Sequence, residues 1–167
     1  MLKLSLLRHA KSSWDNPDLD DFDRPLASRG LRDAPEMGKR LAGRGIRPAL
    51  IVTSPAKRAL QTARLISHEI GVPARKLLQD DRIYMASVPA LIAVIRGLDD
   101  AIGQVLLVGH NPGFTDLVNR ISDGEIDNLP TCGYAEIEFD HTRWKDTGRR
   151  DGRLVHFNFP KNSRGSR

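Results

Sequence analysis

The most apolar segment of the chain is Val105-Leu106-Leu107-Val108, and it runs directly into Gly109-His110-Asn111-Pro112-Gly113. Four apolar residues followed by glycine and proline are typical of a short β-strand that ends in a turn. Leu117, Val118 and Ile121 then recur at helical spacing. This segment therefore predicts a strand, a polar turn and a helix in direct succession.

The same alternation of strand and helix patterns extends along the rest of the chain. Further strands are expected at residues 2–7, 49–52, 135–139 and 154–159, and further helices from 28 to 43 or 45, from 55 to 70 and around 91–98. Such an alternation favours a parallel sheet that is covered by helices on both faces. The sequence therefore predicts an α/β fold with three α/β/α layers and a mostly parallel central sheet.

Single residues add detail to these elements. Ser28 is a candidate N-cap, and Pro35 would remove one backbone hydrogen bond from the helix that follows it. Pro55 and Pro112 each suit the first position of a helix. In the last strand, apolar and polar side chains alternate: Val155, His156, Phe157, Asn158 and Phe159.

The length and composition indicate one ordinary globular domain. With 167 residues, 40% of them apolar and 28% charged, the chain is long enough to bury a core without a disulfide or a metal. We expect this domain to cover residues 1–160 and a disordered tail to cover 161–167. Cys132 is the single cysteine, and no apolar run approaches the roughly 20 residues of a membrane helix. We therefore expect a cytoplasmic protein without a membrane partner.

The net charge of +5 is unevenly distributed. Residues 1–142 carry 18 basic and 19 acidic side chains, whereas residues 143–167 carry 8 basic and 2 acidic ones. The basic excess belongs to one end of the chain, and we expect no nucleic-acid partner. Five acids lie close together in the first part: Asp15, Asp18, Asp20, Asp21 and Asp23. They form either a solvated loop or a patch that helps to select substrates.

Arginine and histidine side chains follow three of the expected strands. The first strand runs into Arg8 and His9, the second is followed by Arg58, and the apolar strand runs into His110. Because the carboxyl ends of parallel strands meet at one edge of a sheet, we expect these four side chains to converge. Helices that begin at this edge would add their positive dipole ends, and the glycines around His110 would let backbone approach a ligand closely. The sequence therefore predicts an anion-binding site.

Two arginines, two histidines and helix N-termini together suit a phosphoryl group. Guanidinium groups bind its oxygens in pairs, and fixed positive charge stabilises the transition state of phosphoryl transfer. A neutral imidazole can attack phosphorus and form a covalent phosphohistidine. Such a site needs neither a metal nor another cofactor. Taken singly, each of these residues is more often a structural hydrogen-bonding group.

Three motifs carry a resemblance to a known family. Leu7-Arg8-His9-Ala10 resembles the Arg-His-Gly signature of the histidine phosphatase superfamily, which is also called the phosphoglycerate mutase-like family. Residues 54–63, with the sequence SPAKRALQTA, resemble its second motif, and Gly109-His110-Asn111 is similar to its third. Residues 8–14 (RHAKSSW), residues 23–26 (DRPL) and the small size look most like the SixA branch of phosphohistidine phosphatases.

The resemblance implies a phosphoglycerate mutase-like fold and a metal-independent mechanism. In that mechanism His9 accepts the phosphoryl group, and Arg8, Arg58 and His110 surround its oxygens until water hydrolyses the phosphohistidine. The implied substrate is phosphohistidine on a phosphotransfer or signalling protein. Compared with the mutases of the family the chain is short, and an uncovered pocket would suit a phosphate that another protein carries.

Two departures from the family pattern affect this interpretation. Ala10 replaces the usual glycine, which the turn tolerates if φ is negative there. The general acid of many family members has no obvious counterpart. Asp81 is the first candidate and Asp80 the second, and both are equally well explained as surface acids. A weak acid would favour phosphohistidine as substrate, because imidazole leaves phosphorus more easily than an alkoxide does.

Other patterns in the sequence lead to no site. The acidic cluster lacks the central glycine of a calcium loop, and Glu138 stands where a cysteine phosphatase built on Cys132 would need arginine. Trp14 is expected to pack rather than to bind a substrate. Three functions remain: a phosphohistidine phosphatase, a phosphatase of small phosphate esters on the same site, and a non-catalytic phosphate-binding module. The presence of both His9 and His110 argues against the third, because a binder needs no nucleophile.

Overall fold

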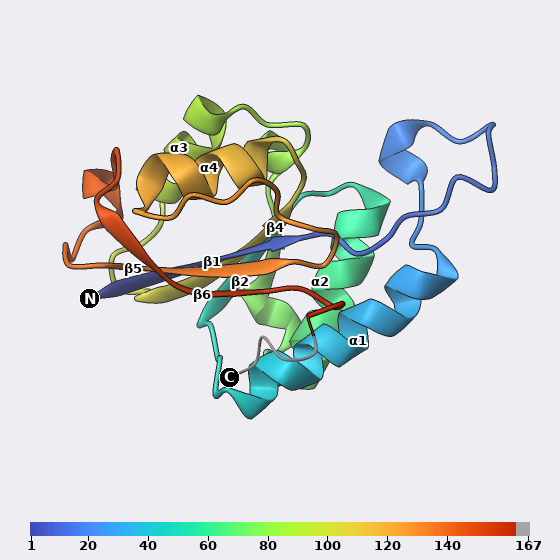
Figure 1. Cartoon of the computed structure of the whole chain (residues 1–167), viewed down its shortest axis with the longest axis horizontal. Helices are drawn as coiled ribbons and strands as arrows, with labels where there is room; N and C mark the ends of the chain where they lie inside the picture. Colours follow the sequence, from blue (N-terminus) through green and yellow to red (C-terminus); the bar gives the residue numbers. More distant parts are fainter. Residues whose placement is uncertain (163–167) are drawn as a thin grey trace.

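Six strands form one sheet in the computed structural model, which describes residues 1–162 (Figure 1). Their bounds are β1 Leu2–Arg8, β2 Leu50–Thr53, β3 Leu77–Gln79, β4 Gln104–Gly109, β5 Tyr134–Phe139 and β6 Gly152–Asn158. The strand order is β3-β2-β4-β1-β5-β6, in which the first four strands are parallel and β5 and β6 are antiparallel to their neighbours. The expectation of a mostly parallel central sheet is confirmed.

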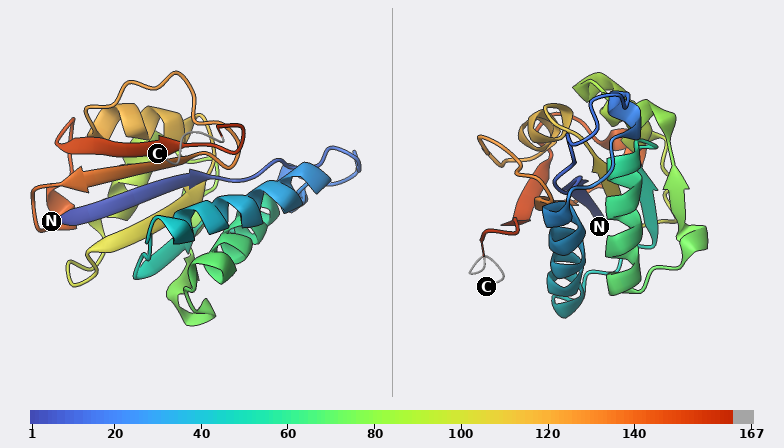
Figure 2. Two further views of the ribbon diagram at one scale, coloured as in Figure 1. Left: turned by 60° about the horizontal axis from the view of Figure 1, so that its bottom comes forward. Right: turned by 90° about the vertical axis from the view of Figure 1, so that its right-hand side faces the viewer.

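Helices cover both faces of this sheet (Figure 2). Their bounds are α1 Ser28–Gly43, α2 Lys57–Ile70, α3 Val88–Arg96 and α4 Gly113–Ile121. Buried side chains of α1 and α2 form one apolar cluster with the sheet, and those of α3 and α4 form another on the opposite face. The α/β/α layering is therefore confirmed, and it matches the phosphoglycerate mutase-like architecture that the resemblance implied.

The sequence of β1 explains why it lies at the centre of the sheet. Leu2, Leu4 and Leu6 belong to the cluster under α3 and α4, whereas Leu7 belongs to the cluster under α1 and α2. Side chains alternate between the two faces of a strand, so a run of leucines fills both clusters. The strand ends at Arg8, where the polar residues of the site begin.

The pairing of the strands fixes the order of the residues at the carboxyl edge. Arg8 of β1 lies opposite Gly109 of β4, and Thr53 of β2 lies opposite Val108. The residues that follow these pairs, His9, Ser54 and His110, therefore stand at three neighbouring strand ends. Hydrogen bonds from the His9 amide to the Gly109 carbonyl and from the Ser54 amide to the Val108 carbonyl extend the ladder to them.

Several expected details are wrong. Ser28 is the first residue of α1, and Ala27 occupies the cap position without a side-chain cap, so Ser28 is not the N-cap. Pro55 lies two residues before α2, and Pro112 lies immediately before α4 rather than inside it. Strand β3 was not expected from the sequence, because three residues are too few to show an alternation of apolar and polar side chains. Helix α1 continues through Pro35.

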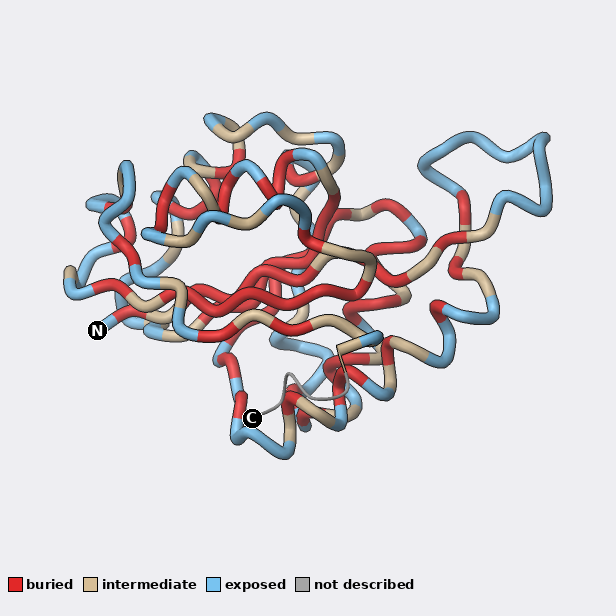
Figure 3. Tube along the Cα trace, viewed as in Figure 1, coloured by how far each residue is buried: buried red, intermediate tan, exposed pale blue. Residues whose placement is uncertain are grey.

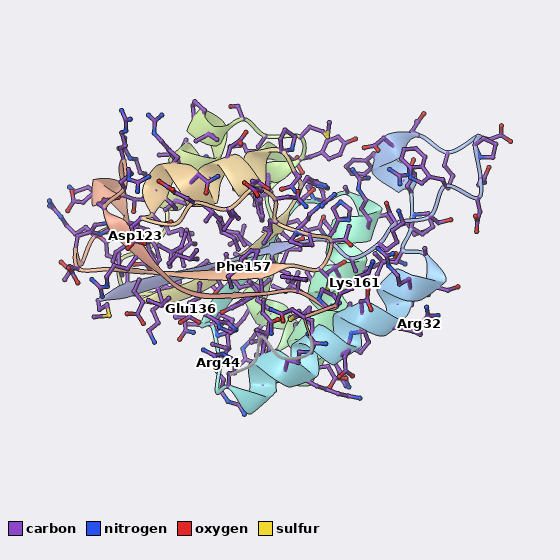
Figure 4. All side chains as sticks on the ribbon, viewed as in Figure 1. Arg32, Arg44, Asp123, Glu136, Phe157 and Lys161 are labelled. Atoms are coloured by element: carbon purple, nitrogen blue, oxygen red, sulfur yellow. The ribbon has the colours of Figure 1, made fainter. Side chains whose placement is uncertain are left out.

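Strand β6 buries its polar residues more deeply than some of its apolar ones. His156 and Asn158 are buried on the α1 side of the sheet, opposite Glu136 and Tyr134 of β5, whereas Val155 is exposed. Phe157 packs into the cluster on the other face (Figure 4). A register irregularity between Glu136 and Ile137 shifts the pairing, and such bulges redirect side chains.

Residues 13–24 project from the carboxyl edge of the sheet, and we call this segment the arm. Figure 1 shows it beyond the ends of α1 and α2, and Figure 3 shows that nearly all of it is exposed. It contains the short 3₁₀ helix η1, Asp21–Asp23. Trp14 lies on the arm and is largely exposed, and one face of its ring packs against the guanidinium of Arg24.

Three further findings concern the helices, the end of the chain and the single cysteine. No helix within residues 1–162 combines the length and the apolar character that crossing a membrane requires. The tail that we expected at 161–167 lies, from residue 163 onward, outside the described residues. Cys132 is buried just before β5, and burial raises the pKa of its thiol.

Candidate active site

His9 and His110 face each other at the centre of the carboxyl edge. The centroids of their rings are 5.2 Å apart, and both side chains are buried. They belong to the ends of the neighbouring strands β1 and β4, so the pairing of these strands sets the distance between them. One phosphoryl group could therefore contact both imidazoles.

A backbone hydrogen bond fixes the proton on His9. Its Nδ1 lies 2.8 Å from the carbonyl oxygen of Ala10. A carbonyl oxygen can only accept, so Nδ1 carries the hydrogen, and Nε2 of the neutral ring keeps a free electron pair. Burial is the main cause that lowers the pKa of His9 to about 3; the positive charges of protonated His110, Arg58 and Arg8 act in the same direction, and the bond to Ala10 opposes the shift. At neutral pH His9 is thus an uncharged base with Nε2 available.

His110 is also uncharged at neutral pH. Burial is the main cause that lowers its pKa to about 4, and the charge of Arg58 acts in the same direction. Its Nε2 shares a hydrogen bond of 2.7 Å with Oγ of Ser54, the residue that follows β2. Within the described residues, its Nδ1 is buried without a hydrogen-bond partner. Ser54 therefore orients the second imidazole of the site.

Arg58 lies in the first turn of α2 and is almost completely buried. Its Nη1 donates to the backbone oxygen of Asp21 at 2.7 Å, and its Nη2 donates to the Asp21 carboxylate at 2.9 Å. Its charge lowers the pKa of both His9 and His110, which places the guanidinium close to the two imidazoles. Arg58 is thus paired with Asp21, and its positive charge still affects both imidazoles.

Thr62 ties the helix that carries Arg58 to the strand that carries His9. Its hydroxyl donates to the Arg58 carbonyl at 2.7 Å and accepts from the Ala10 amide at 3.0 Å. One side chain therefore links the two segments of the site through their backbones. Ala10 is not among the residues with positive φ, which is why alanine replaces glycine there without strain.

Arg8 supplies the second guanidinium of the edge. Its Nη1 donates to the Leu129 carbonyl at 3.1 Å, its partial burial lowers its pKa, and its charge contributes to the lowered pKa of His9. Arg8 also lines a surface pocket of about 300 Å³ together with Arg29, Thr131 and Lys161. The structure thus brings together all four residues that the sequence indicated, Arg8, His9, Arg58 and His110.

Comparisons with known proteins agree with this geometry. The family model described as the histidine phosphatase superfamily (branch 1) matches residues 4–80. An uncharacterized protein of Mycobacterium tuberculosis is 33% identical over 171 aligned residues, which cover 93% of this chain and all of that protein. The chain belongs to the histidine phosphatase superfamily.

Solved structures of this superfamily share the fold over nearly the whole chain. A crystal structure of the "putative phosphohistidine phosphatase SixA" from Agrobacterium tumefaciens is 29% identical, with a TM-score of 0.79 over 95% of this chain and 98% of that chain. The protein histidine phosphatase SixA in complex with tungstate has a TM-score of 0.83 at 21% identity, over 96% of this chain and 99% of that one. Membership of the superfamily and the first of these similarities support a phosphatase activity.

Within residues 1–162, the two aspartates expected as general acid form no hydrogen bond and no ion pair with the imidazoles of this superfamily member. Asp81 is exposed at the start of the short 3₁₀ helix η3, Asp81–Ile83, and makes no side-chain hydrogen bond within residues 1–162. Asp80 caps that helix and pairs with Arg82 at 2.7 Å, an arrangement that lowers its pKa. Neither carboxylate contacts His9 or His110, so a catalytic role for Asp81 stays a prediction without geometric support.

The carboxylate that does reach the site is Asp21, which sequence reasoning grouped with four other acids of the arm. Its Oδ2 accepts from Arg58 and, at 2.7 Å, from the hydroxyl of Tyr84, and its Oδ1 accepts from Arg24 at 3.1 Å. Partial burial alone would raise its pKa, but the hydrogen bonds from Tyr84, Arg58 and Arg24 lower it to about 2. Asp21 is therefore ionised at neutral pH.

Tyr84 completes the rim of the site. Its ring meets the ring of His110 edge-on at 5.6 Å and that of Phe22 at 5.2 Å. Ser54, Asp21 and Tyr84 were all missed from the sequence. Only Ser54 carried a signal, because it directly follows a strand that we expected to end at the site.

Two amides in the first turn of α4 and two glycines beside His110 have roles in the packing of the structure. In α4 the Phe114 amide donates to the His110 carbonyl, and the Thr115 amide donates to Oδ1 of Asn111, so these amides are already paired. A Cβ added to Gly109 would lie 2.6 Å from the Phe114 ring, and one on Gly113 would lie 2.6 Å from a backbone oxygen. Packing therefore requires glycine at both positions, and their expected role of letting backbone approach a ligand stays a prediction.

Proposed function

We propose that this protein is a metal-independent phosphohistidine phosphatase that works through a phosphohistidine intermediate on His9. The observation that carries the proposal is the hydrogen bond from His9 Nδ1 to the Ala10 carbonyl, because it leaves Nε2 unprotonated and aimed away from the backbone. An imidazole with a pKa of about 3 needs no separate base to become a nucleophile at neutral pH.

The proposed reaction has two displacements. His9 Nε2 attacks the phosphorus of a phosphohistidine whose other ring nitrogen carries a proton. A new N–P bond forms, the P–N bond of the substrate breaks, and its electron pair stays on the substrate imidazole, which leaves as a neutral ring, while the phosphorylated His9 ring, with its hydrogen on Nδ1, takes the positive charge. Water then attacks the phosphoryl group on His9, which releases inorganic phosphate and restores the neutral ring. Arg8 and Arg58 stabilise the charge on the phosphoryl oxygens in both transition states.

The acids near the site favour phosphohistidine over phosphate esters. Asp21 is ionised at neutral pH, both imidazoles are uncharged, and within residues 1–162 no carboxyl group forms a hydrogen bond with either ring. An alkoxide leaving group would need a proton donor, whereas an imidazole leaves with less help. We therefore propose phosphohistidine on a phosphotransfer or signalling protein as the substrate, in a reducing cytoplasm.

A second candidate is a phosphatase of small-molecule phosphate esters on the same site. The pocket of about 300 Å³ beside Arg8 favours it, because Arg29 and Lys161 could bind a second anionic group of a small substrate. A phosphate-binding module without turnover is the least supported function, because it would not need the free Nε2 of His9.

The test compares two substrates in the presence of EDTA. We expect the purified protein to dephosphorylate a histidine-phosphorylated phosphotransfer domain faster than an aryl phosphate, with no loss on chelation. A His9→Ala variant should lose turnover by at least about 1000-fold, and an alkaline quench of the wild type should trap phosphate on His9 by mass spectrometry. The exposed His68 of α2 provides the control, His68→Ala, which should retain full activity.

Each part of the proposal can fail separately. Loss of activity in EDTA would contradict the metal-free mechanism. Full activity of His9→Ala would contradict the covalent one. Faster turnover of the aryl phosphate would favour the ester phosphatase.

A further inference from the structure

Four large apolar side chains are exposed around the entrance to the site. Trp14, Leu19 and Phe22 of the arm are 71%, 37% and 39% exposed, and Met85, next to Tyr84, is 66% exposed. These are four of the eight large apolar residues that are exposed in the described part of the chain. Apolar side chains gathered on a surface and rimmed by polar groups mark sites of protein association.

The arm is held in one position although it buries almost no apolar surface. Arg24 at its base is buried and donates to Oγ of Ser12 at 2.6 Å and to the carbonyl of Ser13 at 3.1 Å. The guanidinium of Arg24 lies 3.2 Å from the centroid of the Trp14 ring, which supports a cation–π contact. The exposed side chains are therefore presented by an ordered segment, and ordering them costs little on binding.

The arm also has a fixed relation to the catalytic residues. Asp21 accepts hydrogen bonds from Arg58 at 2.9 Å and from Tyr84 at 2.7 Å, and Phe22 packs edge-on against Tyr84. A group bound against Phe22 thus lies next to Tyr84, whose ring contacts that of His110. The face is therefore placed to contact the molecule that carries the phosphoryl group.

The charge on this face selects the chemistry of its occupant. Asp15, Asp18, Asp20 and Asp23 make no ion pair and no side-chain hydrogen bond within residues 1–162, unlike Asp21. Four carboxylates without a counter-charge attract a cationic surface and repel free anions over about 10 Å at physiological ionic strength. An anionic lipid surface is disfavoured for the same reason.

We propose that Trp14, Leu19 and Phe22 of the arm, with Met85, form a docking surface for a protein substrate whose phosphorylated histidine is surrounded by basic and apolar side chains. This inference rests on the proposed function and adds the kind of partner. The carboxylates steer the basic side chains, the apolar residues supply contact area, and the fixed arm places the phosphohistidine over His9.

The experiment uses two phosphohistidine peptides that differ only in their flanks. One carries lysine and leucine around the phosphohistidine, and the other carries glutamate and serine. We expect wild-type kcat/KM to be at least about 10-fold higher for the basic peptide at low salt, with the ratio falling at high salt. Replacing the four free acids by Asn (Asp15→Asn, Asp18→Asn, Asp20→Asn and Asp23→Asn) should bring the ratio close to one. Turnover of an aryl phosphate should stay within about twofold.

Two further variants complete the test. A matched control removes four acids elsewhere (Glu36→Gln, Glu69→Gln, Asp99→Asn and Glu125→Gln) and should keep the preference. The second variant combines Leu19→Ser with Met85→Asn, because asparagine tolerates the positive φ at position 85. It should lower kcat/KM for the basic peptide severalfold and leave turnover of the aryl phosphate unchanged.

Binding to the His9→Ala variant, followed by fluorescence anisotropy, separates this proposal from the proposed function. If neither peptide is hydrolysed but the basic one still binds preferentially, the phosphohistidine activity fails and the docking surface stands. If the wild type hydrolyses both peptides equally well, or if the control loses the preference as the arm variant does, the docking surface is overturned.

Discussion

The carboxyl edge of the sheet and the arm differ in what holds them in place. His9 and His110 follow strands that are paired in the sheet and covered by apolar clusters on both faces. The arm has no buried residue between positions 14 and 23 and is held by the polar contacts of Arg24 and Asp21. The chemical groups are thus fixed by packing, whereas the recognition surface is fixed by hydrogen bonds that single substitutions can remove.

Replacing Arg58 by lysine is expected to have the largest effect on this arrangement. Lysine keeps the charge but loses the planar donor fork, so it cannot bind Asp21 and phosphate oxygens together. We expect kcat/KM to fall by about 100-fold for protein and aryl substrates alike. Steady-state kinetics measures this, with the exposed Arg64→Lys on the same helix as control. A loss below about threefold would mean that Arg58 serves the arm and not the phosphate.

Asp21→Asn tests the link between the two regions directly. The amide retains an acceptor for Arg58 but removes the charge that holds Arg24, Arg58 and Tyr84 together. We expect kcat/KM to fall by about 10-fold and amide hydrogen exchange to accelerate in residues 13–24, because charged hydrogen bonds are stronger than neutral ones. If KM fell instead, Asp21 would compete with the phosphoryl group rather than position Arg58.

Tyr84→Phe should have a smaller effect. It removes the hydroxyl that donates to Asp21 and keeps the ring that packs against His110 and Phe22. We expect a twofold to threefold decrease in kcat/KM, because the lost hydrogen bond lies at a partly exposed site and Arg58 and Arg24 still hold the Asp21 carboxylate. A loss as large as that of Asp21→Asn would show that the phenol itself takes part in the reaction.

The smallest change is expected from mild acid. The pKa values of His9 and His110 are lowered to about 3 and about 4, so both rings should stay neutral from pH 7 to pH 5, where an ordinary histidine would become charged. Titration of the two imidazoles by NMR measures this. Midpoints near 6.5 would contradict the burial of the site.

Linkage gives the sign of the corresponding stability change. In the unfolded chain these histidines bind protons near pH 6.5, whereas in the folded chain they do so only near pH 4 and pH 3. The unfolded state therefore binds more protons between these values, and the free energy of unfolding should decrease as the pH falls below about 6.5. Denaturant unfolding of the wild type and of His9→Ala should show a shallower decrease for the variant.

The sequence predicted the site residues whose positions depend on the packing of the sheet, and it missed Asp21, whose position depends on the arm. Arg8, His9, Arg58 and His110 were found because each follows a strand with a clear apolar pattern, and parallel strands meet at one edge. Asp21 could not be distinguished from its four neighbouring aspartates, because its role depends on Arg58, 37 residues further along the chain. Asp81 was chosen by its position in the sequence, yet it is exposed.

Two parts of the fold could not be predicted from the sequence. Strand β3 is three residues long, too short for a hydrophobic period, and it forms by pairing with β2. In β6 the register irregularity at Glu136 leaves Val155 exposed and brings Leu154 and Phe157 into the same apolar cluster, which the alternation of the segment does not predict. Both features depend on how the segment pairs with its neighbouring strand, and the sequence of the segment alone does not show that register.

The hydrogen bond from His9 to the Ala10 carbonyl sets the tautomer of the proposed nucleophile through the main chain. The acceptor is present whatever side chain follows the histidine, so the family can exchange glycine for alanine at this position without altering the reactive nitrogen. Selection can therefore act on the size of residue 10, which is completely buried beside Thr62, independently of the chemistry. The path of the main chain after β1 therefore determines that Nε2 is the free nitrogen of His9.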